Sequence, residues 1–306
     1  MLEVKRISNF IAKVLMIVLI AFGILFAHAP VPFAVNPIYA YSPCNCVIFA
    51  MDDIADYGLT RVQIATMNYF IAMNLPFTPS IIVSKLANSS NLLVFHKVEE
   101  GINKGLFELA IHGYRHINHT LLSREEQEHD FSMAKGKLEY LFGKKVDIFI
   151  PPFNNFNLHT IEALSDLHIS VFSTHPDTEQ RTINPYKLKS LFVTSNSKLE
   201  VSKVDDEKPL VYHVPFVASF LRLSTEGYFG AESVEQSLKL IDEGIAKYGF
   251  AQVRLHPTDF SKVNATTGKN INQVDIIKFQ RLTTLIKNLE DRNIKIASFS
   301  KIYPHS

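Results

Sequence analysis

Apolar runs of five to seven residues alternate along the chain with longer segments of helical period, from residue 46 to the C-terminus. Such runs are typical of buried strands, and strands that alternate with helices pair in parallel. About eight repeats of this unit are what a closed or nearly closed barrel requires. We therefore expect an α/β fold, a distorted (β/α) barrel of about seven to eight strands, with an open doubly wound sheet as the alternative. The expected strands are Cys46–Met51, Pro79–Ser84, Phe107–His112, Val146–Ile150, Ile169–Ser173, Leu210–Val214, Phe250–His256 and Ile294–Ser298.

Two of the intervening segments carry specific helix signals. The residues Ser123–Glu126 have the form of a capping box, in which the Ser and Glu side chains satisfy free backbone N–H groups, so a helix is expected to begin there. Near the C-terminus, spacings of i, i+3, i+4 and i+7 place four apolar residues on one helical face, which we expect to pack into the core. These residues are Leu282, Leu285, Ile286 and Leu289.

The polar stretch Pro176–Pro209 fits neither a helix nor a strand. It is rich in Ser, Thr, Asn and Lys, which favour irregular structure over a packed element. We expect an irregular excursion within one domain, with a short strand at Leu191–Thr194. An acidic pair within it, Asp205-Asp206, has charged neighbours and no apolar run before it, and is expected in a surface loop.

The composition is that of a folded protein and excludes some partners. The chain has 306 residues, of which 47% are hydrophobic and 20% charged, with a net charge of +1. Because no basic stripe is present, we expect no nucleic-acid partner. The only cysteines, Cys44 and Cys46, lie two positions apart, a spacing that rarely meets disulfide geometry, and we expect them to be structurally uninformative.

Residues 1–40 have the order of an export signal. Three basic residues precede the apolar run Val14–Ala27, and three prolines follow it. Cleavage is expected after Ala40; an uncleaved membrane anchor is the second interpretation and a buried N-terminal helix the third. In the first two cases the domain formed by residues 41–306 is extracellular or at the cell surface, and it contacts the membrane through this segment if the segment is not cleaved.

Residues whose side chains could take part in catalysis or metal binding lie where the expected strands end. The first strand ends in Asp52-Asp53, and the third ends in His112, with His116 four residues further on. The fourth runs into Pro152-Phe153, and the seventh ends in His256. Because functional groups of parallel α/β folds collect at the carboxyl ends of strands, these side chains are expected to meet. Two imidazoles and a carboxylate are ligands typical of a divalent metal.

These residues resemble the motifs of the polysaccharide deacetylases with a NodB-type homology domain. That family has a distorted (β/α) barrel with an Asp-Asp pair after the first strand, an H-x-x-x-H motif, an R-x-P-[YF] turn and a final strand that closes on His. Asp52-Asp53, His112–His116, Pro152-Phe153 and Val253–His256 match these motifs in order. The resemblance covers the chain from about Cys46 to the C-terminus, and it implies a metal-dependent hydrolase that removes acetyl groups from an N-acetylated glycan.

The resemblance also implies a role for each matching residue. Asp53, His112 and His116 would bind a divalent metal, with zinc as the expected ion. Asp52 would be the general base and His256 the general acid. Three further residues, Pro152, Phe153 and Tyr114, would contact the sugar. Acetate and a free amino sugar would be the products.

The chain departs from the family pattern at two motifs. Ile150 stands where the third motif has Arg, and Arg254 is the candidate replacement because it lies on the same strand face as His256. The family's D-x-x-D-W motif is absent, and either Asp259 or Asp177 could orient His256 in its place. These departures keep two alternatives open: a surface glycan-binding protein without turnover, and a metal hydrolase that cuts another amide or an ester.

Overall fold

The structure is a computed structural model that describes residues 44–88, 91–175, 192–194, 200–202, 211–219 and 233–303. The chain divides into two units, residues 1–40 and 41–306, and every described residue lies in the second. The export segment therefore lies outside the described residues and stays a prediction. No helix within the described ranges is long and apolar enough to cross a membrane.

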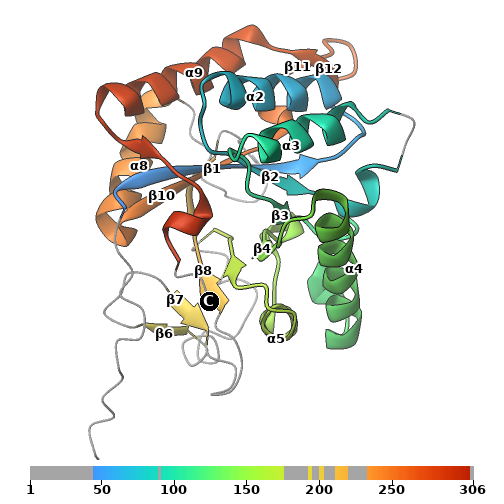
Figure 1. Cartoon of the computed structure of the whole chain (residues 1–306). Coiled ribbons are helices and arrows are strands. Elements are labelled where there is room, and N and C mark those ends of the chain that lie inside the picture. Colours follow the sequence, from blue (N-terminus) through green and yellow to red (C-terminus); the bar gives the residue numbers. More distant parts are fainter. Residues whose placement is uncertain are drawn as a thin grey trace, which may run out of the picture. The chain divides into compact units, whose positions relative to one another are not determined.

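The centre of the domain is a parallel sheet of eight strands curled into a half-barrel (Figure 1). Its order is β8-β5-β4-β3-β2-β1-β10-β9, and the short β13 pairs with the beginning of β1. The expected fold is confirmed, as an open half-barrel in which the described parts of the outer strands β8 and β9 do not pair. The strands are β1 (Cys46–Ile54), β2 (Thr78–Ile81), β3 (Ala110–Ile111), β4 (Ile148–Phe149), β5 (Val171–Phe172), β8 (Val211–His213), β9 (Phe216–Ser219), β10 (Phe250–Leu255) and β13 (Lys295–Ile296).

Helices connect these strands, as parallel pairing requires. The first two, α2 and α3, pack against each other, as do α4 and α5, while α8 packs on β10 and on α9 (Figure 1). The capping box at Ser123 and Glu126 is confirmed at the start of α4. The four apolar residues expected on one face of the last helix are all buried in α9. The helices are α2 (Thr60–Ala72), α3 (Leu93–Asn103), α4 (Arg124–Phe142), α5 (Leu158–Asp166), α8 (Val234–Tyr248) and α9 (Ile276–Asp291).

The first strand organises the sheet. Residues 46–51 of β1 are buried on both faces, because β1 lies between β2 and β10 and packs into apolar side chains on either side. This explains its uninterrupted apolar sequence, which is typical of central strands in parallel sheets. The register also has a functional consequence. The ladder pairs Met51 with Leu255, so the residues that follow Met51 in β1 and Leu255 in β10 lie at the same edge of the sheet.

Several features differ from the expectation. Cys44 and Cys46 form a disulfide, so the prediction that they are uninformative is wrong. Asn45 between them adopts a left-handed backbone conformation (φ 47°), which brings the two Cα atoms to 5.1 Å. The strand β9 was not predicted, and neither were β7 (Glu200–Ser202) or the hairpin of β11 (Ser261–Val263) and β12 (Asn270–Val274).

The polar excursion is described only in part. A short strand, β6 (Phe192–Thr194), confirms the one expected near Leu191, and it pairs antiparallel with β7. The pair Asp205-Asp206 and the candidate Asp177 lie outside the described residues.

Candidate metal centre and active site

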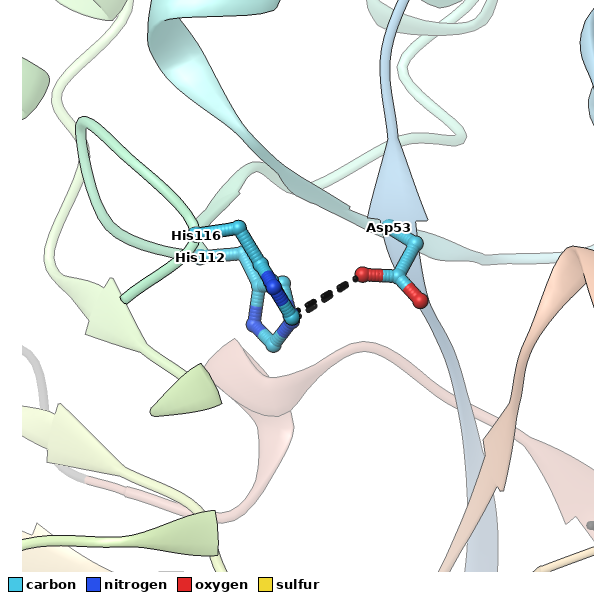
Figure 2. Close-up of side chains that lie close together, drawn as sticks. All are labelled: Asp53, His112 and His116. Atoms are coloured by element: carbon cyan, nitrogen blue, oxygen red, sulfur yellow. Dashed lines mark ion pairs between the residues drawn. The ribbon is translucent and has the colours of Figure 1, made fainter. Parts of the chain in front are cut away.

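Three of the predicted residues form a compact cluster. Asp53 lies in β1, His112 directly follows β3, and His116 lies in the next loop (Figure 2). The Oδ1 atom of Asp53 is 3.5 Å from Nε2 of His112 and 3.2 Å from Nε2 of His116. One ligand atom from each residue lies within 4.8 Å of the others. The structure thus brings together the three residues predicted to bind a metal.

The loop between the two histidines needs its glycine. Gly113 has φ +76°, and a Cβ atom there would lie 2.5 Å from the carbonyl oxygen of Arg115. Only glycine allows this close curl without strain. The buried carboxylate of Asp130 also holds this loop. It accepts a hydrogen bond from the backbone N–H of Tyr114 at 2.8 Å and lies 3.0 Å from Nε2 of His119.

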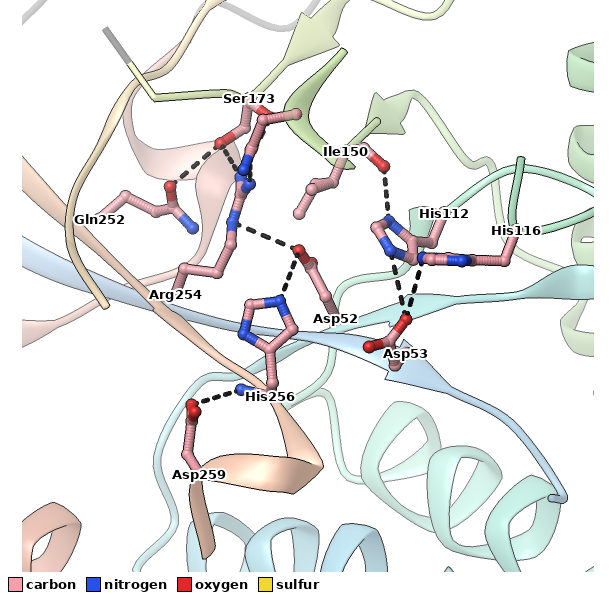
Figure 3. Close-up of polar contacts among 11 residues, drawn as sticks. Asp52, Asp53, His112, His116, Ile150, Ser173, Gln252, Arg254, His256 and Asp259 are labelled. Atoms are coloured by element: carbon pink, nitrogen blue, oxygen red, sulfur yellow. Dashed lines mark hydrogen bonds and ion pairs between the residues drawn. The ribbon is translucent and has the colours of Figure 1, made fainter. Parts of the chain in front are cut away.

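His112 is oriented by a backbone carbonyl. Its Nδ1 atom lies 2.7 Å from the carbonyl oxygen of Ile150, so Nδ1–H donates to that oxygen and Nε2 faces Asp53 (Figure 3). A hydrogen bond of this kind fixes the tautomer and the ring orientation of metal-binding histidines. Ile150 therefore contributes its main chain to the site, a role that its side chain does not signal.

The electrostatics of the cluster favour a cation. Burial raises the pKa of Asp53, but the hydrogen bond from His112 and the charges of three nearby histidines outweigh it and hold that pKa well below its usual range. Burial lowers the pKa of His112, but the carboxylates of Asp52 and Asp53 outweigh it and raise that pKa. Burial, together with the charge of His112, lowers the pKa of His116. A field that favours positive charge on an almost fully buried imidazole also attracts a metal ion.

The donor set fits a divalent metal. Two imidazole nitrogens and one carboxylate oxygen are a common three-ligand set for catalytic zinc, which leaves a further coordination position for water or substrate. His112 presents the required Nε2, and Asp53 is only partly buried, so that the site is accessible from solvent. Asp53, His112 and His116 are the residues that would hold the ion.

Asp52 lies beside this cluster and is held by Arg254. The carboxylate is 2% exposed, and its Oδ2 atom is 3.5 Å from Nε of Arg254, itself 1% exposed (Figure 3). The guanidinium donates further hydrogen bonds to the side chain of Asn154 at 2.5 Å and to Ser173 at 3.0 Å. It also lies over the ring of Phe216, with Cζ 4.0 Å from the ring centroid. The replacement expected for the missing motif arginine therefore lies at the carboxylate of Asp52.

The second oxygen of Asp52, Oδ1, is buried and has no hydrogen-bond partner among the described residues. A buried carboxylate oxygen without a donor is costly unless water or substrate supplies one. Figure 3 shows Asp52 between the Arg254 side chain and the metal cluster. This oxygen is thus suited to accept a proton from a water molecule at the site.

His256 follows β10 and completes the constellation. Its Nε2 atom is 3.7 Å from Oδ2 of Asp52. The buried carboxylate of Asp259 accepts a hydrogen bond from the backbone N–H of His256 at 2.7 Å. Burial raises the pKa of Asp259 to about 6, against the opposing effect of His256. Asp259, one of the two acids considered for orienting His256, therefore contacts its main chain, whereas the other, Asp177, lies outside the described residues.

The residues predicted to contact sugar have different environments. Phe153 is 52% exposed, and its ring meets the imidazole of His116 edge-on at 4.5 Å between centroids. Pro152 is buried at the start of the short turn that presents Phe153. Tyr114 is partly buried and lines a groove of about 770 Å³ that begins at Asp53 and His116. The sequence reasoning missed Asn154 and Ser173, polar residues that lie after β4 and β5 and fix Arg254.

The structure thus combines a half-barrel of parallel strands with an Asp-His-His cluster at the carboxyl edge of its sheet, which is a candidate site for a divalent metal. The sequence profile of the polysaccharide deacetylases matches residues 43–172. This match confirms the resemblance seen in the motifs for residues 43–172, which are similar to the polysaccharide deacetylase family.

Solved structures share the fold at low sequence identity. A protein of Mycobacterium smegmatis assigned to the polysaccharide deacetylases is 14% identical, with a TM-score of 0.52 over 88% of this chain and 98% of that one. A peptidoglycan N-acetylglucosamine deacetylase is 12% identical, with a TM-score of 0.50 over 86% and 89%. A CE4 family pseudoenzyme of Bacillus anthracis is also 12% identical, with a TM-score of 0.48 over 84% and 65%. No curated protein sequence matches the chain.

Proposed function

We propose that the chain is a metal-dependent deacetylase that hydrolyses the acetamide of an N-acetylated sugar in a glycan, with zinc as its ion. The observation that carries this proposal is the position of Asp52, a buried carboxylate with one free oxygen, directly beside the Asp53–His112–His116 cluster. A metal site alone is compatible with either a structural or a catalytic role. A base beside it is what hydrolysis requires.

The side chains divide the reaction between them. When bound, a divalent cation supplies Lewis acidity, which polarises the acetamide carbonyl and makes water a better nucleophile at neutral pH. Asp52 Oδ1 accepts the proton that water loses as its oxygen adds to the carbonyl carbon. His256 then donates a proton to the sugar nitrogen as the C–N bond breaks. The products are acetate and the free amino sugar.

The surrounding residues hold these groups in place. Arg254 fixes Oδ2 of Asp52 and leaves Oδ1 free. The carbonyl of Ile150 keeps Nε2 of His112 available as a ligand. The exposed ring of Phe153 provides an apolar surface next to His116 against which a sugar ring can pack. The predicted export segment, residues 1–40, would place this activity at the cell surface or outside the cell.

Acetate release tests this function and separates it from the two alternatives. The zinc-loaded chain should release acetate from N-acetylated oligosaccharides faster than from simple acetyl esters. The variant Asp52→Asn should retain its metal, but its rate of acetate release should fall roughly 10²–10⁴-fold. Sugar binding without acetate release would identify a glycan-binding protein instead. Preference for the esters would identify a hydrolase of another class.

A further inference from the structure

The groove that begins at the metal cluster extends along two loops that carry positive charge. Besides Asp53 and His116, its walls include Tyr57 from the loop after β1, Lys85 from the loop after β2, and Arg115 from the loop after β3. These three loops follow adjacent strands of the half-barrel. The groove is therefore continuous with the catalytic edge of the sheet.

The two loops that carry the cations are hydrogen-bonded to each other. The backbone N–H of Ser84 donates to the carbonyl of Tyr114 at 2.8 Å, and that of Val83 donates to Gly113 at 3.2 Å. These bonds pair the residue before Lys85 with the residue before Arg115. The two cations thus stand at corresponding positions on neighbouring loops.

Buried carboxylates fix both loops from behind. Asp56, 7% exposed, accepts hydrogen bonds from the backbone N–H groups of Ala87, Val94 and Phe95. Three such donors satisfy its charge locally. Asp130 holds the other loop through the N–H of Tyr114. The groove wall is consequently preorganised, which lowers the entropic cost of binding a ligand.

The charges that line the groove are unbalanced. Lys85 is exposed, and its ammonium has no acidic partner in the described part of the chain. Arg115 is 61% exposed and shares one edge of its guanidinium with Asp130 at 3.5 Å. Among the described residues, the only carboxylate that lines the groove is Asp53, which belongs to the Asp53–His112–His116 cluster. The groove therefore has an excess of positive charge, which a bound divalent ion would increase.

Tyr57 supplies the apolar part of the same wall. Its side chain is 70% exposed, so that the ring presents an apolar face to the groove. An exposed aromatic ring next to hydrogen-bond donors is typical of sites for sugar rings.

We propose that this groove selects an acidic glycan, in which a sugar ring packs on Tyr57 while its carboxylate or phosphate group is bound by Lys85 and Arg115. This inference rests on the proposed function, because it assumes that the metal cluster acts on a sugar of the same chain. It goes beyond that function in naming the charge of the substrate.

The affinity of the groove for glycans that the protein cannot deacetylate tests this proposal. The full chain, purified in mild detergent, is titrated calorimetrically with a non-acetylated uronic-acid oligosaccharide, a phosphorylated oligosaccharide and a neutral oligosaccharide of equal length. We expect at least one acidic ligand to bind about tenfold more tightly than the neutral one, with the preference lost at high salt. The ligand that shows it, carboxylate or phosphate, identifies the acidic group.

Variants locate the effect. Lys85→Met should weaken acidic binding roughly three- to tenfold and leave neutral binding unchanged, as expected for loss of one exposed charge-assisted contact. Arg115→Gln should also weaken acidic binding, but this substitution removes an ion-pair partner of Asp130 as well. The Lys85 variant is therefore the decisive test of charge recognition. Lys287→Met, an equivalent change on the exposed face of α9, serves as the control and should change nothing.

The outcomes separate this inference from the proposed function. Equal affinity for acidic and neutral ligands, or unchanged acidic binding in Lys85→Met, overturns the inference even if neutral N-acetylated sugars are deacetylated. Conversely, charge-selective binding that Lys85→Met abolishes supports the groove even if no acetate is released, and that result would contradict only the proposed reaction.

Discussion

Arg254 is the residue whose replacement tests the catalytic site most informatively. It lies beside Asp52, as does His256, and takes the place of the arginine that the third motif lacks; the side chains of Asp52 and Arg254 are almost completely buried. In Arg254→Met the apolar stem is retained, but the carboxylate of Asp52 loses its counter-charge. Two unit charges 3.5 Å apart attract each other by about 5 kcal/mol at an effective dielectric constant of about 20.

The net cost is smaller than this attraction, because folding must also desolvate both groups. Removal of one partner from a buried pair typically lowers the free energy of unfolding by roughly 3–5 kcal/mol. Replacement of both partners is much less costly, since no uncompensated charge remains. Arg254→Met should therefore destabilise the chain by about 3–5 kcal/mol, and Asp52→Asn combined with Arg254→Met should recover much of that loss.

Urea unfolding of the wild type, both single variants and the double variant measures this coupling directly. Arg61→Met, which removes an exposed arginine on α2, is the matched control and should change stability by less than about 0.5 kcal/mol. Acetate release should fall roughly 10²–10⁴-fold in Arg254→Met, as it does when a general base is lost or misplaced. Additive effects of the two substitutions, with no coupling, would refute the proposed ion pair.

Three further predictions concern other parts of the domain. Burial, reinforced by the charge of Asp147, raises the pKa of Glu108 to about 7 from 4.5. The contribution of Glu108 to stability should therefore be complete below about pH 4.5, where this residue is protonated in both the folded and the unfolded state, and up to about 3 kcal/mol of it should be lost as the pH rises to about 7. Glu108→Gln should remove this loss when the free energy of unfolding is measured between about pH 4 and 8. Phe153→Ala should raise KM for N-acetylated oligosaccharides several-fold without loss of metal, whereas Tyr140→Ala, another exposed aromatic residue, should leave KM unchanged. Gly113→Ala should lower the free energy of unfolding by more than about 1 kcal/mol and weaken metal affinity, because its Cβ would collide with the main chain of the histidine loop; unchanged affinity would contradict this.

The sequence was sufficient to predict a distorted barrel-like α/β fold and the cluster at its edge, but not that the barrel is open. Apolar runs that end in polar residues mark both the strands and the positions where functional groups emerge, and parallel pairing then brings those ends together. The agreement is closest for β1, where six consecutive buried residues precede Asp52. It is poorer for strands such as β3, which is expected over Phe107–His112 but is a continuous strand only at Ala110–Ile111, because a run of apolar residues reports burial and not the length of the hydrogen-bonded ladder.

Other features could not be read from residue types. The orientation of His112 depends on the carbonyl of Ile150, and every residue carries a carbonyl. The disulfide depends on the left-handed conformation of Asn45, which residue spacing does not reveal. Lys85 and Arg115 lie thirty positions apart, and their proximity follows only from the hydrogen bonds between two loops. Tertiary contacts made by the backbone thus set the limit of the prediction.

Metal binding by the full chain tests the account most directly. Titration of the metal-free chain with zinc, followed by calorimetry and elemental analysis, should show about one tightly bound ion per chain. His112→Ala should abolish tight binding, whereas His129→Ala, which removes an exposed histidine on α4, should retain it. A chain that binds no divalent ion, or a His112→Ala variant that binds zinc as tightly as the wild type, would contradict the assignment of Asp53, His112 and His116 as the metal centre.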